Sequence, residues 1–344
     1  MNNNLFFKRM KKYFILAAAA LMLGSCSNSS DEGGKAVTNP TDNTFRLKST
    51  VAGSKAGSTR ADGTDIQTSN IENGQSVFAT FTSSVGATET SWGSGATSKT
   101  ATYTADGSGN LTGASVKWPC TTAGTETVSI TAWAPATAVP SPWAVKTDQT
   151  AKADYLASDL LYGISSAITH DDIANPITIN FEHKLAKINV KIAGGSKADG
   201  TELAVSDLTN AKIVFAEGTN VTTPVAYLVT DATIVGSTVT KGSTKSAITV
   251  TTAYNATEFA SAVIIPQVIE AASTTDADKK ILFSVTLPGD LSKTYQYNIG
   301  ANKEFKAGYE YTYNITIRGD QNTIILTEQI AKWTDGGNEA IIAQ

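Results

Sequence analysis

The residue whose setting points most directly to chemistry is Cys26, a thiol that could be acylated. An apolar run over residues 13–23 leads into Leu23-Gly24-Ser25 and then into this cysteine. Four basic residues precede the run: Lys8, Arg9, Lys11 and Lys12. Basic, apolar and then small residues are the order of a secretory signal peptide, and the run is shorter than the roughly 20 residues that span a bilayer. We therefore expect residues 1–25 to be a signal peptide and the chain to leave the cytoplasm.

The four residues that end at Cys26 resemble the bacterial lipobox, in which the thiol takes a diacylglyceryl group and the signal is cut just before it. A plain signal peptide with an incidental cysteine is the alternative. Residues 27–34 are polar and glycine-rich, so 26–43 are expected to form a flexible tether. Asp31 and Glu32 in this tether resemble the surface-export signal of Bacteroidetes lipoproteins. This pattern favours a lipid anchor on the outer face of the outer membrane.

Catalytic and metal-binding patterns are scarce in the sequence. Only two histidines occur, His170 and His183, and no Cys-x-x-Cys, His-Glu-x-x-His, P-loop or Rossmann pattern is present. His183 shares a strand face with Phe181 and Leu185, which predicts a hydrogen-bonded core histidine. His170-Asp171-Asp172 is either a cation site or, more simply, a solvated turn. We expect a protein that is not an enzyme and needs no cofactor or metal.

Length and charge narrow the class further. The chain has 344 residues, enough for roughly two domains, and a net charge of -4 at pH 7. Nucleic-acid binding needs a basic face, so no nucleic-acid partner is expected. If Cys26 is acylated, Cys120 has no partner for a disulfide bond. Cys120 is expected to be a small packed residue, and stability must come from packing.

Alternating apolar residues predict the elements that must position any site. One face each is formed by Val77, Ala79 and Phe81; by Val128, Ile130 and Ala132; by Ile281, Phe283, Val285 and Leu287; and by Tyr309, Tyr311, Tyr313, Ile315 and Ile317. Period-two alternation indicates half-buried strands, and Gly, Ser, Asp and Asn between them indicate turns. The fold class predicted is all-β, with two tandem β-sandwich domains.

Three segments interrupt the regular strand pattern and define the predicted division into domains. Apolar parity slips within residues 176–192, so this segment is one strand with a bulge or two strands around a bend. The glycine-rich stretch 193–200 is the best domain boundary, giving an N-terminal domain over 61–194 and a C-terminal domain over 195–344. Residues 151–168 are the one plausible helix or irregular insert.

Four stretches, taken in order, resemble the fimbrillin family of Bacteroidales type V pilus subunits. They are the lipoprotein signal; Asp159-Leu160-Leu161-Tyr162-Gly163 followed by residues 181–192, which begin Phe181-Glu182-His183-Lys184-Leu185-Ala186-Lys187-Ile188; Ala307-Gly308-Tyr309 through Ile317; and Ile330-Ala331-Lys332-Trp333-Thr334-Asp335-Gly336-Gly337. The resemblance implies transthyretin-like (Greek-key) sandwiches and a place at the cell surface, in a fimbria. It also implies other fimbrial subunits as partners, an arginine-specific protease, and assembly in which a strand of one subunit replaces the cleaved first strand of another.

The sequence offers candidates for both halves of that exchange. Residues 44–60 hold a candidate removable strand, with Phe45, Leu47 and Val51 on one face, and a linker with a cleavage site at Arg60-Ala61. Candidate donor residues lie near the C-terminus: Ile324, Leu326, Ile330, Ile341 and Ile342. Ile341 and Ile342 could equally close their own sheet. Whether the subunit belongs to the stalk, the tip or the anchor stays open.

A monomeric outer-membrane lipoprotein that binds glycans is the alternative function. Trp133 lies on the polar-looking face of its strand, so it is the tryptophan expected to be exposed for stacking on a sugar. A host protein or glycan is a further candidate partner. Arg318-Gly319-Asp320 could suggest integrin binding, but it falls where a hairpin turn is needed.

Overall fold

Apolar alternation near the N-terminal end of the described chain builds a β-sheet that closes on itself. The computed structural model describes residues 43–52, 69–122, 124–138, 142–219, 225–256, 258–271, 280–288 and 293–333, and the backbone of 341–342. The closed sheet has the strand order β1-β4-β3-β2-β5-β7-β8. Its strands are β1 (Leu47–Val51), β2 (Ser76–Ser83), β3 (Ser98–Ala105), β4 (Asn110–Thr112), β5 (Val128–Ala134), β7 (Leu161–Ile168) and β8 (Ile177–His183).

The predicted inward faces of β2 and β5 are confirmed. Val77, Ala79 and Phe81 are fully buried, as are Val128, Ile130 and Ala132. β2 pairs antiparallel with both β3 and β5. These side chains form the centre of the first of two hydrophobic clusters.

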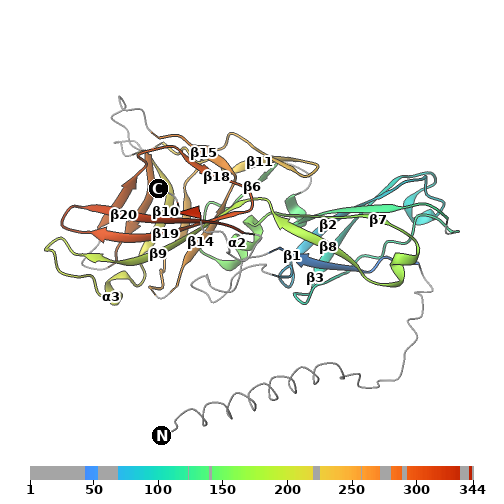
Figure 1. Ribbon diagram of the computed structural model, residues 1–344, viewed down its shortest axis with the longest axis horizontal. Coiled ribbons are helices and arrows are strands. Elements are labelled where there is room, and N and C mark those ends of the chain that lie inside the picture. Colours follow the sequence, from blue (N-terminus) through green and yellow to red (C-terminus); the bar gives the residue numbers. More distant parts are fainter. Residues whose placement is uncertain are drawn as a thin grey trace, which may run out of the picture. The chain divides into compact units, whose positions relative to one another are not determined.

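β1 is the strand that closes this sheet. It pairs in parallel with β8 from Leu47↔Ile177 to Val51↔Phe181, and antiparallel with β4 at Leu47↔Leu111. Figure 1 shows the blue β1 beside the yellow-green β8, although most of the barrel separates them in sequence. Both edges of β1 are therefore paired within its own chain.

The later strands enclose the second hydrophobic cluster. One sheet has the order β14-β9-β19-β20-β21, and a second has the order β13-β10-β16-β17. The first contains β9 (Ala186–Ser196), β14 (Ala260–Ile264), β19 (Tyr309–Arg318), β20 (Thr323–Lys332) and β21 (Ile341–Ile342). The second contains β10 (Lys212–Thr219), β13 (Ile248–Thr251), β16 (Lys280–Thr286) and β17 (Thr294–Asn298). Smaller sheets join β6 (Trp143–Ala144), β11 (Asp231–Val235) and β12 (Thr238–Lys241), and β15 (Gln267–Ile269) with β18 (Lys303–Phe305).

The tyrosine-rich segment forms the strand predicted for it. β19 lies between β9, with which it is parallel, and β20, with which it is antiparallel. Tyr311, Tyr313 and Ile315 are almost fully buried on its inward face. β19 thus lies at the centre of its sheet, and its apolar alternation reflects the burial of this inward face.

Arg318-Gly319-Asp320 begins the predicted hairpin turn between β19 and β20. The Gly319 amide donates to the Ser196 carbonyl at 2.9 Å, and the Ser196 hydroxyl donates to Asp320 at 3.3 Å. A Cβ on residue 319 would lie 2.3 Å from the Ser196 oxygen. The glycine is therefore required for close packing of this turn.

The segment 176–192 forms two strands, the second of the two predicted alternatives. β8 ends at His183 and β9 begins at Ala186. The side chains change from the first hydrophobic cluster to the second between Phe181 and Leu185. β9 continues through the glycine-rich residues to Ser196, past the predicted boundary at 194–195. The division into domains stays a prediction.

Helix is a minor part of this all-β fold. The prediction of a helix or irregular insert over residues 151–168 holds only for its first part, α2 (Lys152–Ser158), because Leu161–Ile168 is β7, a regular strand of the closed sheet. The other helix, α3 (Val205–Leu208), is a single turn. Short 3-10 turns cover Thr90–Trp92, Ala136–Ala138 and Asp171–Ala174. Within the described ranges, none of the helices has the length and apolar character needed to cross a bilayer.

Candidate functional site

The inward side of β1 is inserted into the first hydrophobic cluster. Phe45, Leu47 and Val51 are 2%, 3% and 6% exposed. The Phe45 ring lies 5.1 Å from that of Phe81 and 5.5 Å from that of Trp118, measured between centroids. Burying one such side chain is worth about 1.5–3 kcal/mol. β1 is consequently a structural part of the barrel core.

The aromatic group around Phe45 is held in place by a buried hydrogen bond. The Trp118 indole donates to Glu126 at 2.7 Å. This hydrogen bond holds the pKa of the Glu126 carboxyl below its ordinary value, since it favours the ionised form. On β3, burial raises the pKa of Tyr103 well above its ordinary range. At neutral pH the Glu126 carboxyl is therefore ionised and the Tyr103 hydroxyl keeps its proton.

The chain leaves and re-enters the barrel at one place. The Val51 amide donates to the Ser69 carbonyl at 2.9 Å, and the Ala52 amide donates to the Phe181 carbonyl at 2.9 Å. The ends of the segment between Ala52 and Ser69 are thus held together. The predicted cleavage residues Arg60 and Ala61 belong to this segment, and they and Cys26 lie outside the described residues.

The candidate donor residues lie in the last strands of the second cluster. β20 pairs with β19 at ten positions, and Ile324 is buried whereas Leu326 and Ile330 are partly buried. The backbone of Ile341–Ile342 pairs with β20 at only two positions. In this structure these residues extend their own sheet. Their role as donors stays a prediction.

Residues of two of the resembling stretches, the second and the fourth, meet in one buried cluster. His183 Nδ1 and Asp159 Oδ1 are joined by a hydrogen bond of 2.9 Å, and both side chains are fully buried. The His183 ring stacks on Trp333, with centroids 3.6 Å apart and planes 7° apart. The predicted hydrogen-bonded core histidine is confirmed. The sequence did not show that Asp159 and Trp333 would be its neighbours.

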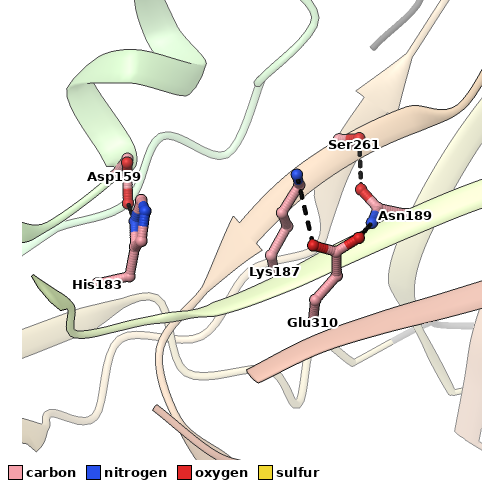
Figure 2. Close-up of polar contacts among 6 residues, drawn as sticks. All are labelled: Asp159, His183, Lys187, Asn189, Ser261 and Glu310. Carbon is pink, nitrogen blue, oxygen red and sulfur yellow. Dashed lines mark hydrogen bonds and ion pairs between the residues drawn. The ribbon is translucent and has the colours of Figure 1, made fainter. Parts of the chain in front are cut away.

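A second polar group lies on neighbouring strands (Figure 2). Lys187 Nζ is 3.7 Å from Glu310 Oε2, and Asn189 Nδ2 donates to Glu310 Oε1. Ser261 Oγ donates to Asn189 Oδ1 at 2.7 Å. Lys187 also lies over the Trp333 ring, 5.6 Å from its centroid. These contacts tie β9, β14 and β19 to the residue that follows β20.

Burial also raises the pKa of two tyrosines on the face of β19 opposite Glu310. It raises the pKa of Tyr311 to about 12, and the pKa of Tyr313 lies well above its ordinary value because of burial and the nearby Glu328. Both hydroxyls remain protonated at neutral pH. They act as structural hydrogen-bond donors or acceptors; Tyr311 accepts from the Lys306 amide at 2.8 Å.

Other candidates from the sequence have structural roles. Trp133 is 6% exposed and packs on Tyr162, with ring centroids 4.7 Å apart, so the expectation that it is exposed for stacking on a sugar was wrong. Its strand face is covered by residues of the second hydrophobic cluster. Asp172 accepts hydrogen bonds from the Thr169 amide and hydroxyl, which lower its pKa within a turn. Among the described residues, no group of three or more His, Cys, Asp or Glu side chains could hold a metal.

Comparison with known proteins identifies the family to which this chain is similar. The family model described as fimbrillin-like matches residues 59–333. A solved protein from Bacteroides uniformis ATCC 8492, described as a cell adhesion protein, is 21% identical with a TM-score of 0.55, covering 86% of this chain and 100% of that chain. The tip fimbrial protein Mfa3 from Porphyromonas gingivalis, with a C-terminal truncation, is 11% identical with a TM-score of 0.47, covering 84% and 99%. No curated protein sequence matches. The likeness to the B. uniformis protein agrees with the all-β fold.

Proposed function

This chain belongs to the fimbrillin-like family, and from that premise we propose that it is a structural or adhesive subunit of a cell-surface fimbria. The proposed role needs no catalysis and no cofactor. The subunit acts by binding other fimbrial subunits through backbone hydrogen bonds and packed apolar side chains. The observation that carries the proposal is the position of β1. This strand closes the barrel because it pairs with β4 along one of its edges and with β8 along the other.

Displacement of β1 would create an acceptor groove. β4 and β8 would each present unpaired N–H and C=O groups, and the pockets of Phe45, Leu47 and Val51 would open to water. An exposed edge with an apolar slot binds an extended strand from another chain. We propose that a neighbouring subunit supplies this strand.

Two features of the sequence, a predicted lipidation site and a predicted cleavage site, suit an exchange that begins only after export. We propose that the precursor is exported as a lipoprotein on Cys26 and that an arginine-specific protease cuts after Arg60. Because the contacts of Phe45, Leu47 and Val51 are non-covalent and buried, cutting alone leaves β1 in place. The donor strand then displaces it, and the lipid-bearing fragment leaves with it.

The pairing of the last strands favours one donor candidate over another. Releasing β20 would break its pairing with β19 at ten positions. Releasing Ile341–Ile342 would break pairing at only two. We propose that donation by this chain uses the Ile341–Ile342 end, because its release costs far less backbone pairing.

Locking β1 into the barrel tests the proposal. Lys48 and Asn110 are exposed and lie directly opposite each other in the antiparallel register. Opposite Cα atoms in such a pair are about 4.5–5.5 Å apart, within reach of a disulfide. With Cys120→Ser, the Lys48→Cys/Asn110→Cys variant is expected to form no polymer when oxidised and to regain assembly on reduction. Electron microscopy and SDS-resistant ladders measure the polymer.

The controls are the two single-cysteine variants with Cys120→Ser. Each should assemble under both redox conditions, because neither can link β1 to β4. Polymer formation by the oxidised double variant, with the disulfide verified by mass spectrometry, would show that assembly does not require β1 to leave.

The cleavage proposal has its own test. Arg60→Ala is expected to leave the surface protein uncut at this position, with residue 26 still at its N-terminus, because the protease needs the arginine side chain. N-terminal sequencing and mass spectrometry of the surface form measure this. Arg46→Ala is the matched control, since Arg46 lies beside β1 and donates to the Ala174 carbonyl. Normal removal of residues 26–60 from the Arg60→Ala variant would assign the cut elsewhere.

A further inference from the structure

One inward position of β1 differs from the others. Phe45, Leu47, Ser49 and Val51 alternate toward the barrel interior, and Ser49 is 1% exposed. Its Oγ has no hydrogen-bond partner among the described residues. A buried hydroxyl that has lost its water without gaining a partner destabilises the state that buries it. Ser49 therefore weakens the binding of β1 to its own barrel.

The strand next to Ser49 is closely packed. Ser49 is paired with the fully buried Ile179 on β8, and its amide donates to the Gly109 carbonyl at 2.7 Å. Ile179 in turn fills the space above Gly163, where a Cβ would lie 2.6 Å from Ile179 Cγ2. The layer at this level is closely packed. Because Ser49 is buried beside Ile179 in this layer, we expect the position to favour a small apolar side chain.

We propose that the β1 groove selects a donor strand with an alanine-sized apolar residue at the Ser49 position. The inference rests on the strand exchange proposed above. The preferred donor is an extended strand of another fimbrial subunit, with large apolar side chains at the Phe45, Leu47 and Val51 positions. Because such a donor buries no unsatisfied hydroxyl, it binds more tightly than β1. This difference drives the exchange forward without an external energy source.

Peptide exchange on the full chain tests the proposal. A specific protease site is placed between Ala52 and Ser69, the chain is cut there, and synthetic peptides of residues 43–52 compete with a labelled native peptide in fluorescence anisotropy. The Ser49→Ala peptide is expected to bind with a dissociation constant about tenfold lower than the native peptide, equivalent to about 1.4 kcal/mol. The Ser49→Leu peptide should bind more weakly than the native one, because it overfills the layer.

The Lys48→Ala peptide is the matched control, since Lys48 points outward, and it should bind like the native peptide. If peptides exchange but Ser49→Ala binds no more tightly than native, the selection proposed here is wrong and strand exchange stands. If no peptide enters the cut chain over days, the groove does not exchange strands. The proposed function then fails together with this inference.

Discussion

Replacing Trp333 by alanine is expected to lower the free energy of unfolding by about 3–5 kcal/mol, the range for deleting a buried tryptophan side chain. The ring is fully buried, stacks on His183 and lies under the Lys187 ammonium. The Trp333 amide also donates to the Gly308 carbonyl at 2.7 Å, which holds the residue at the end of β20. Urea denaturation followed by circular dichroism measures the loss.

Two variants make that result specific. Ile325→Ala removes an apolar side chain from β20 itself, but Ile325 is 45% exposed and the change should cost far less. Trp333→Phe retains a ring over His183 and removes an indole N–H that has no hydrogen-bond partner among the described residues. It should lose less than half as much as alanine. A loss below about 1 kcal/mol for Trp333→Ala would contradict the structural role of the stack.

Lys187→Met is expected to cost about 3–5 kcal/mol, because it leaves the Glu310 carboxylate buried without the ammonium beside it. Lys187 is 1% exposed and the Glu310 residue 9% exposed, so little water reaches the carboxylate to replace the lost contact. The double variant Lys187→Met/Glu310→Gln should be more stable than Lys187→Met alone. The glutamine oxygen can still accept from Asn189, and both charges of this pair are removed.

Lys306→Met is the control for an ion pair in water. Lys306 lies 3.3 Å from Glu304, and both side chains are more than half exposed. Exposed pairs are worth at most about 1 kcal/mol, so this variant should unfold nearly as the parent does. Additive losses for Lys187→Met and Glu310→Gln in a double-mutant cycle would show that the buried pair is not coupled.

The strands with one solvated face could be predicted from the sequence, but the polar cluster could not. Alternation placed Tyr311 and Tyr313 inward on β19, and burial confirms this. The same rule predicts that Glu310, between two tyrosines, lies on the other face and meets water, because it assumes that polar residues between apolar ones are solvated. The sheet of β9, β14, β19 and β20 is covered on both faces at this level, so Lys187 and Glu310 are buried.

Contacts between stretches that are far apart in the sequence could not be predicted either. Asp159, His183 and Trp333 were each part of a stretch that resembled the family, but nothing local to any of them specifies the other two. Trp133 was misjudged for a related reason. Strand parity located its face correctly but could not reveal that Tyr162 and the second hydrophobic cluster cover that face.

The parallel pairing of β1 with β8 gives the groove a direction. A replacement that restores both ladders must enter with its N-terminal end beside Ile177 and its C-terminal end beside Phe181, because β4 and β8 fix the order of donors and acceptors. Every junction made in this way has the same orientation. A filament built from such junctions is polar, with an empty groove at one terminus and an undonated strand at the other. The two termini of such a filament would therefore be chemically different.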